Sequence, residues 1–309
     1  MSTPEIEPGR LFIGGRWRES SSGSRTEVID PSTGWAATTV AEADATDVDA
    51  AVRAAIGGRR GDGSGTISRD GAALGGHFFG QSSFADLALV EERSLVKVDP
   101  DVPLELIAPL GCGVQTGVGA VWNVLRPEVG ATLVVLGAGA VGLSSVMAAA
   151  LSPATTIIAV DRVPERLALA RELGATHTVN TAEVDLAEAV LDLTDRHGAD
   201  GIVETTGSIT VLRQGVDALA SRGTLAVVGA PPFGTEVSLD VNAMIPGRKV
   251  VGVTLGDTET QTFIPALVRL IRDGRLPLHR LISHYPFADI DQAVRDMTAG
   301  KAIKPVLTF

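Results

Sequence analysis

One stretch of six residues limits what this chain can fold into more than any other. The run 137–142 reads Gly-Ala-Gly-Ala-Val-Gly, follows an apolar run at 131–136 typical of a buried strand, and precedes a helix-forming segment. In this context Gly137 permits a tight turn, Gly139 lets the backbone approach a pyrophosphate, and Gly142 lets helix and strand pack closely. The sequence therefore predicts a dinucleotide-binding unit.

Strand-like and helix-like segments alternate after this unit. We expect strands at 155–160, 177–179, 202–204, 224–228 and 249–253, with helices between them at 164–173, 183–195 and 210–219. This alternation predicts a doubly wound α/β fold, in which helices cover both faces of a parallel (Rossmann) sheet.

An acidic residue, Asp161, follows the second strand of this pattern, about 20 residues beyond the turn. A carboxylate there accepts hydrogen bonds from ribose hydroxyls and repels a 2′-phosphate, so the sequence favours NAD over NADP. Arg162 stands beside it and softens that preference. The alternative role for Asp161 is to cap the helix that begins near Pro164.

Composition argues against several classes of partner. The net charge of −11 would repel a phosphate backbone, so we expect no nucleic acid partner. The single cysteine, Cys112, allows no internal disulfide and suits a reducing, cytoplasmic compartment. Glycines and a proline interrupt the longest apolar region, at 131–160, and no basic-then-apolar leader opens the chain. We therefore expect no membrane association.

Six runs of residues carry a second signal. They are Gly-His-Phe-Phe-Gly-Gln-Ser-Ser-Phe-Ala at 76–85, Pro-Leu-Gly-Cys-Gly-Val-Gln-Thr-Gly at 109–117, the glycine turn itself, Ala-Val-Asp-Arg at 159–162, Leu-Gly-Ala-Thr-His at 173–177 and Gly-Lys-Ala-Ile-Lys-Pro-Val-Leu at 300–307. Together they resemble the zinc-type medium-chain alcohol dehydrogenases, and among them the aryl (benzyl) alcohol dehydrogenases. The resemblance implies hydride transfer between an aromatic primary alcohol and NAD.

The resemblance also implies roles for individual residues. Cys112 matches a ligand of the catalytic zinc. The implied cofactor contacts are Thr116 and Val141 beside the nicotinamide, Asp161 and Arg166 on the adenosine ribose, Val228 and Ala230 in the loop that binds the carboxamide, and Lys304 on the pyrophosphate. Members of the family pair their subunits through the edge of the sheet, which implies a homodimer formed near residues 249–255.

The zinc that the resemblance implies lacks most of its ligands in this sequence. In the family, the first part of a β-rich (GroES-like) catalytic domain supplies a Cys and a His to the catalytic zinc, and a lobe with four cysteines binds a structural zinc. A catalytic zinc takes three protein ligands and a water. We expect an incomplete catalytic domain in which Cys112 is a remnant ligand with no zinc bound, which puts turnover in question. A substitute site built on His77 and Cys112 is the weaker alternative.

Two other functions stay open at this point. Related medium-chain enzymes reduce quinones or enones without a metal, and a chain of this kind could also bind NAD without catalysis. Asp161 counts against the metal-free reductase, because those enzymes mostly use NADPH.

The start of the chain carries a different resemblance. Leu-Phe-Ile-Gly-Gly-Arg-Trp at 11–17, Val-Ile-Asp-Pro-Ser-Thr-Gly at 28–34 and Asp-Val-Asp-Ala-Ala-Val at 47–52 resemble the N-terminal segment of aldehyde dehydrogenases, which implies a fusion. We therefore expect four parts: this segment at 1–56, a catalytic-domain remnant at 57–112, the NAD-binding domain at 113–253, and a C-terminal segment at 254–309 that returns to the catalytic domain.

Overall fold

A computed structural model describes residues 10–13, 16–29, 36–42, 44, 46, 67–69, 72–74, 94–99 and 101–309. The chain divides into two compact units, Met1–Leu95 and Val96–Phe309. The runs at 76–85 and 47–52, the expected boundary at 56/57 and His77 lie outside the described residues.

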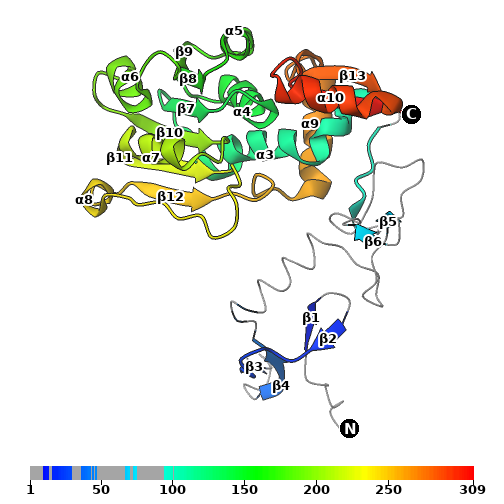
Figure 1. Ribbon diagram of the computed structural model, residues 1–309. Coiled ribbons are helices and arrows are strands. Elements are labelled where there is room, and N and C mark those ends of the chain that lie inside the picture. Colours follow the sequence, from blue (N-terminus) through cyan, green and yellow to red (C-terminus); the bar gives the residue numbers. More distant parts are fainter. Residues whose placement is uncertain are drawn as a thin grey trace. The chain divides into compact units, whose positions relative to one another are not determined.

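A parallel sheet of six strands forms the centre of the larger unit (Figure 1). Its strands are β7 (Thr132–Leu136), β8 (Thr156–Asp161), β9 (His177–Asn180), β10 (Ala199–Glu204), β11 (Leu219–Val227) and β12 (Lys249–Gly252). Their order in the sheet is β12-β11-β10-β7-β8-β9. The chain thus starts at the centre, winds outward through β8 and β9, and returns to β10 before winding out the other way. This order confirms the doubly wound α/β class.

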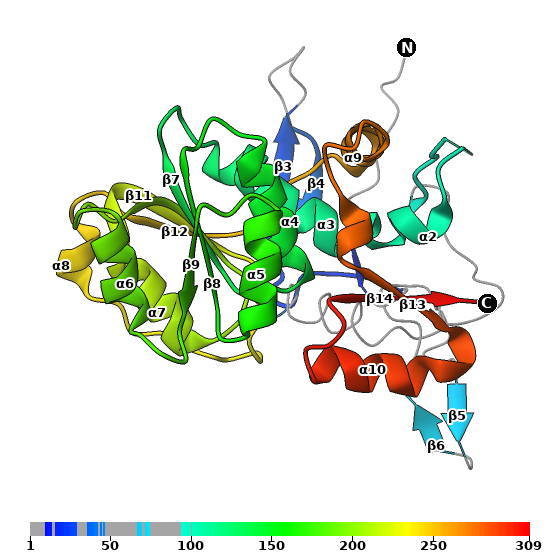
Figure 2. The ribbon, with the colours of Figure 1, turned by 90° about the horizontal axis from the view of Figure 1, so that it is seen from above.

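Helices cover both faces of the sheet (Figure 2). One face carries α4 (Ala140–Ala150) and α5 (Pro164–Glu172), and the other carries α6 (Leu186–Leu193) and α7 (Ile209–Asp217). Successive residues of β7 alternate between two core clusters, with Leu133 packed in one and Val134 in the other. Because both faces are buried, such strands read as unbroken apolar runs in the sequence.

The segment before the sheet is helical. It consists of α2 (Leu104–Ile107), the 3₁₀ turn η3 (Ala108–Gly111), α3 (Gly113–Gly119) and the π-helical turn η4 (Ala120–Leu125). Every residue of α3 is buried. Within the described residues, no single helix has the length and apolarity to cross a membrane, although α2–η3 and α3–η4 pass together as a bent pair on length and composition alone.

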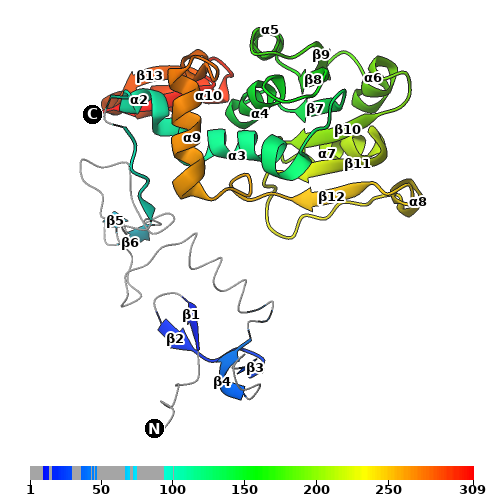
Figure 3. The same cartoon turned by 180° about the vertical axis from the view of Figure 1, so that it is seen from behind.

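The C-terminal segment packs against this helical segment. Helix α9 (Thr260–Arg272) lies beside α3 (Figure 3), and the two share one core cluster. Helix α8 (Val241–Met244) precedes β12 and α9 in the chain. The elements after α9 are η5 (Leu278–Arg280), β13 (Ile282–Pro286), η6 (Phe287–Asp289), α10 (Ile290–Thr298) and β14 (Lys304–Thr308). Strands β13 and β14 pair in parallel as a small separate sheet.

The smaller unit contains three antiparallel strand pairs among its described residues. They are β1 (Leu11–Ile13) with β2 (Arg16–Arg18), β3 (Arg25–Ile29) with β4 (Ala36–Ala41), and β5 (Ile67–Arg69) with β6 (Ala72–Leu74). The guanidinium Nε of Arg25 donates to Thr39 Oγ1 (2.9 Å), which joins β3 to β4 through side chains.

The expected helix at 210–219 was wrong at its end. Helix α7 stops at Asp217, and Leu219 is already the first residue of β11. Leu219 is fully buried and pairs with Ala199, so a buried place in the sheet outweighs the local helical pattern.

Burial of Leu225 in β11 gives a direct test of this core. Leu225 is fully buried in the cluster on the α6–α7 side. We expect Leu225→Ala to lower the free energy of unfolding by about 2–5 kcal/mol, because the cavity that it leaves cannot close fully. The matched control is Leu193→Ala, whose side chain is partly exposed at the end of α6. This variant should change the free energy of unfolding by less than about 0.5 kcal/mol. Urea unfolding checks both variants, and equal losses would contradict the assigned core.

A carboxylate–phenol pair in the C-terminal segment predicts a pH effect. Tyr285 Oη donates to Asp296 Oδ2 (3.0 Å). Hydrogen bonds from Gln292 and Tyr285 hold the pKa of Asp296 below its ordinary value, whereas partial burial and Asp296 raise the pKa of Tyr285. Because the pKa of Asp296 is lowered on folding, its carboxylate contributes stability above pH 3.8, the unfolded value, and this contribution is lost as the pH falls through the folded pKa. Because the pKa of Tyr285 is raised on folding, its phenol contributes stability below pH 10.0, the unfolded value, and this contribution is lost as the pH rises through the folded pKa.

We therefore expect Tyr285→Phe to reduce stability at neutral pH and the difference from wild type to shrink below pH 3.8. Urea midpoints measured across the acid range check this. A difference that does not change with pH would contradict the pair.

Candidate cofactor-binding site

The glycine turn between β7 and α4 has the geometry that its sequence predicts. Gly137 has a φ of +94°, in the region that favours glycine. A Cβ on Gly142 would lie 1.7 Å from the carbonyl oxygen of Gly137, so only glycine fits there. A Cβ on Gly139 would meet nothing within 4 Å and would point into open space. The turn is closed on its protein side and open where a ligand would approach.

Helix α4 begins at this turn with its N-terminus uncapped. Gly139 is the N-cap residue and supplies no side-chain hydrogen bond. The first N–H groups of a helix have no partner within the helix and carry a partial positive charge. This end of α4 can therefore bind a phosphate group.

The carboxylate of Asp161 joins the end of β8 to the glycine turn. Its Oδ2 accepts the backbone N–H of Ala138 (2.7 Å), and its Oδ1 accepts those of Arg162 (2.8 Å) and Val163 (2.9 Å). The alternative role as a helix cap was wrong, because the N-cap residue of α5 is Val163 and no side chain caps this helix. Asp161 Oδ1 instead bonds the two residues before the helix, and Oδ2 keeps capacity for one further donor. The carboxylate can therefore accept one further hydrogen bond, from a ribose hydroxyl at Oδ2, because Oδ1 already accepts two.

The two arginines near Asp161 differ in position. Arg162 is exposed, whereas Arg166 on α5 is half-buried with its Nη1 4.0 Å from Asp161 Oδ2. The Nε of Arg166 is buried and has no hydrogen-bond partner among the described residues. Its guanidinium is therefore placed beside the Asp161 carboxylate with bonding capacity left over. Lys304 lies at the start of β14, where its backbone N–H donates to Leu281 (3.0 Å), and no described contact joins it to the glycine turn.

The loop after β10 also borders the glycine turn, and sequence reasoning missed it. Thr205 Oγ1 donates to the carbonyls of Leu136 (2.8 Å) and Gly137 (3.2 Å). A Cβ on Gly137 would lie 2.6 Å from this hydroxyl oxygen. The available signal was a polar run, Thr-Thr-Gly-Ser at 205–208, directly after a buried strand.

Glu204 connects that loop to the one after β11. Its Oε1 accepts the backbone N–H groups of Thr206 (2.7 Å) and Gly207 (3.1 Å), and it also accepts the Thr206 hydroxyl. Its backbone carbonyl accepts the N–H groups of Val228 and Gly229 (both 2.9 Å). The turn with Val228 and Ala230 is thereby fixed against the β10 loop, with Val228 half-buried and Ala230 exposed.

Cys112, Thr116 and Val141 lie together where α3 meets α4. Cys112 is exposed, which rules out a purely buried packing role for its thiol. Thr116 is buried, and its Oγ1 donates to the Cys112 carbonyl (2.8 Å). A methyl carbon of Val141 would lie 3.5 Å from a Cβ placed on Gly113, the first residue of α3. The sequence-predicted nicotinamide residues are thus neighbours on two packed helices.

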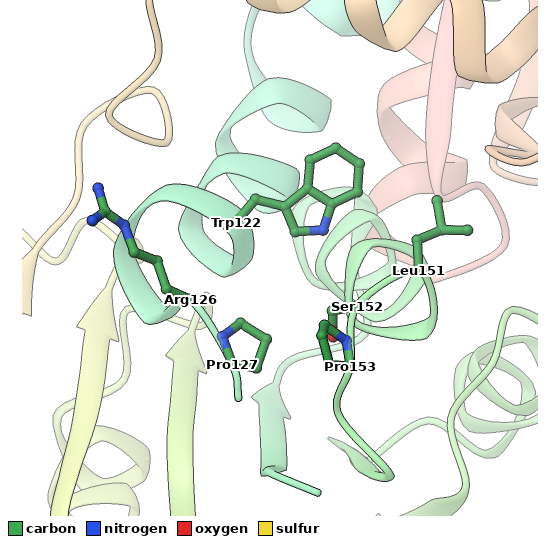
Figure 4. Close-up of a pocket in the computed structure, with 6 residues that line it drawn as sticks. All are labelled: Trp122, Arg126, Pro127, Leu151, Ser152 and Pro153. Carbon is green, nitrogen blue, oxygen red and sulfur yellow. The ribbon is translucent and has the colours of Figure 1, made fainter. Parts of the chain in front are cut away.

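Two cavities lie at the other end of the strands, where their amino ends meet. One, of about 270 Å³, is lined by Trp122, Arg126, Pro127, Leu151, Ser152 and Pro153 (Figure 4). The other, of about 570 Å³, is lined by the amino ends of β7, β8, β10 and β11 and by the segment 193–198. Ligands of open α/β sheets bind at the carboxyl ends of the strands, so neither cavity is the cofactor site.

Comparison with known proteins agrees with this geometry. The zinc-binding dehydrogenase family matches residues 140–272. Geraniol dehydrogenase of Castellaniella defragrans is 38% identical over 255 residues, which cover 82% of this chain and 68% of that protein. The chain belongs to the zinc-binding alcohol dehydrogenase family.

Other members of this alcohol dehydrogenase family extend the match. S-(hydroxymethyl)glutathione dehydrogenase of Synechocystis sp. is 32% identical, over 85% of this chain and 72% of its own. The crystal structure of benzyl alcohol dehydrogenase from Acinetobacter calcoaceticus superposes with a TM-score of 0.74 at 46% identity, covering 79% of this chain and 68% of its own. The crystal structure of an alcohol dehydrogenase zinc-binding domain protein from Burkholderia ambifaria superposes with a TM-score of 0.77 at 48% sequence identity. The match covers 86% of this chain and 74% of that protein. The chain therefore spans about two thirds to three quarters of these alcohol dehydrogenases.

The described residues alone do not supply a catalytic zinc site. A catalytic zinc needs three protein ligands. Among the described residues, no group of three or more His, Cys, Asp or Glu side chains could hold a metal. Cys112 is thus unsupported as a ligand in the described part of the chain, and His77 lies outside it.

The resemblance of residues 11–55 to an aldehyde dehydrogenase segment stays a prediction. The relatives named above are alcohol dehydrogenases and a glutathione-adduct dehydrogenase, so they give the proposed fusion no support. The described part of this segment forms the antiparallel pairs β1–β2 and β3–β4, and short hairpins do not identify a family.

The glycine turn predicts opposite outcomes for two similar substitutions. Gly142→Ala should destabilise the larger unit by several kcal/mol, because its methyl group collides with the Gly137 carbonyl. Gly139→Ala should leave the unfolding midpoint near that of wild type, because its methyl group meets no protein atom and its φ of −82° suits alanine. Urea or thermal unfolding of both variants checks this. Equal stability of the two would contradict the geometry of the turn.

Proposed function

We propose that this chain binds NAD across the carboxyl ends of its sheet strands. The observation that carries the proposal is the arrangement of Asp161 and the glycine turn at the point where the strand order reverses, between β7 and β10. The adenosine half would lie over β7 and β8, with a ribose hydroxyl donating to Asp161 Oδ2 and the pyrophosphate at the start of α4. Arg166 would add a donor beside that ribose.

The nicotinamide half would lie over β10 and β11. Thr116 and Val141 would border the ring from α3 and α4, and the backbone around Val228 and Ala230 would bind the carboxamide. Lys304 would reach the pyrophosphate from the C-terminal segment. These residues hold and orient the cofactor, which is the part of hydride transfer that depends on alignment.

We infer that the substrate class, where turnover occurs, is an aromatic primary alcohol or its aldehyde. The relationship to benzyl alcohol dehydrogenase at 46% identity supports this class. Turnover by the family route requires a zinc with two ligands besides Cys112, and the described residues do not provide them. The proposal therefore separates NAD binding, which this chain's own residues support, from alcohol oxidation, which depends on a metal.

A homodimer and a cytoplasmic location complete the proposal. Strand β12 lies at the edge of the sheet, and Val241 and Ile245, which precede it, are exposed. Pairing near residues 249–255 would cover such side chains. The single cysteine supports a reducing compartment.

Calorimetry with NAD and assays with benzyl alcohol test the proposal on the full chain. We expect wild type to bind NAD more tightly than NADP, and Gly139→Ala to weaken NAD binding about tenfold or more, because its methyl group enters the pyrophosphate space. No binding at millimolar NAD would overturn the proposal.

Three outcomes distinguish the catalytic alternatives. Oxidation of benzyl alcohol that a chelator abolishes would establish the zinc-dependent enzyme. Quinone reduction with NADPH in the presence of chelator would select the metal-free reductase. Tight NAD binding without turnover of any alcohol or aldehyde would leave a non-catalytic binding protein.

A further inference from the structure

Within the described residues, the buried carboxylate of Glu204 has no cationic partner. The residue is fully buried, and no salt bridge in the described part of the chain includes it. Its three donor groups are the Thr206 hydroxyl and the backbone N–H groups of Thr206 and Gly207. In each of these bonds the carboxylate accepts, which suits its ionised form.

The donors around Glu204 solvate its charge but do not cancel it. N–H and O–H groups are dipoles with no net charge, and the same holds for helix α7, whose positive end begins nearby at Ile209. Protein also packs closely against the second oxygen of the carboxylate, since a Cβ on Gly229 would lie 2.7 Å from Glu204 Oε2. At longer range the group therefore acts as one net negative charge in a poorly screened interior.

The strand order places this charge under one half of the cofactor site. Glu204 is the last residue of β10, and it pairs with Leu136 of β7 on one side and Val227 of β11 on the other. Asp161 assigns the adenosine half to the β7–β8 side, so the nicotinamide half lies on the β10–β11 side. The nicotinamide ring is cationic in NAD⁺ and neutral in NADH.

We propose that the buried charge of Glu204 favours oxidised over reduced cofactor in this site. The inference rests on the proposed NAD binding. A negative charge attracts the cationic ring and leaves the neutral ring unaffected, so it lowers the Kd for NAD⁺ relative to that for NADH. Glu204 thereby biases the site toward the form of the cofactor that accepts a hydride, without touching the cofactor.

Glu204→Gln tests the charge at nearly constant shape. We expect the ratio Kd(NADH)/Kd(NAD⁺), measured by calorimetry on the full chain, to fall roughly three- to tenfold, the effect of a unit charge across about 10–15 Å at an effective dielectric constant near 20 with partial salt screening. Both affinities falling by the same factor would mean that Glu204 only holds the loops, and would overturn the proposal.

Asp200→Asn is the matched control. Asp200 is an exposed carboxylate near the start of the same strand, about 13 Å from Glu204 by strand geometry. Its loss should leave the ratio unchanged within about twofold, because solvent screens it. An equal shift in both variants would show a general effect of net charge and would count against Glu204. If wild type binds neither cofactor form, the proposed NAD binding fails instead.

Thr206→Val keeps the test decisive if the glutamine variant does not fold. It removes one donor to the carboxylate and disturbs the β10 loop, but it retains the net charge. The ratio Kd(NADH)/Kd(NAD⁺) should then stay within about twofold of the wild-type value, because the charge that acts at longer range is unchanged. A ratio that falls roughly three- to tenfold in this variant would overturn the proposal, because the loop rather than the charge would then set the ratio.

Discussion

The close approach of Gly142 to the carbonyl of Gly137 is the contact on which the rest of the larger unit depends. It lets α4 start directly after the end of β7, so that the first N–H groups of the helix lie at the carboxyl end of that strand. A second approach of this kind sets the other side of α4, since a Cβ on Gly117 would lie 2.2 Å from the Val141 carbonyl. The Ser145 hydroxyl donates to the Gly117 carbonyl (3.0 Å) across the same contact. Helices α3 and α4 are therefore held in register with the turn.

Sequence reasoning predicted the sheet because local and global signals agree there. Strands buried on both faces are continuous apolar runs, and the glycines and Asp161 stand at fixed distances from them. The prediction failed where the decisive contact was distant. Leu219 follows a helical pattern, but its pairing with Ala199 makes it a strand residue. The π-helical turn η4 likewise had no local signal, and its end at Arg126 has a φ of +48°.

The candidate site was predicted in the same uneven way. Asp161 was found because its spacing from the glycine turn is fixed by one strand and one helix. Glu204 was missed because its importance comes from two loops that meet only in the folded sheet. The segment at 255–257 shows the same limit. It has three successive residues with positive φ, and Asn123 holds it by donating to the Gly256 carbonyl (3.0 Å) from 133 residues away.

The strand order also decides when the cofactor site can come into existence during folding. Strands β7 and β8 are near neighbours in the chain, so the glycine turn and Asp161 can meet early. The central pair β7–β10 forms only after a loop of more than 60 residues has closed, because Thr205 and Leu136 are 69 residues apart. Closing this longer loop costs more entropy than pairing β7 with β8, and such non-local pairings slow folding. The adenosine side should thus be assembled before the nicotinamide side, and a nascent chain would gain the nicotinamide side only after both β10 and β11 had emerged.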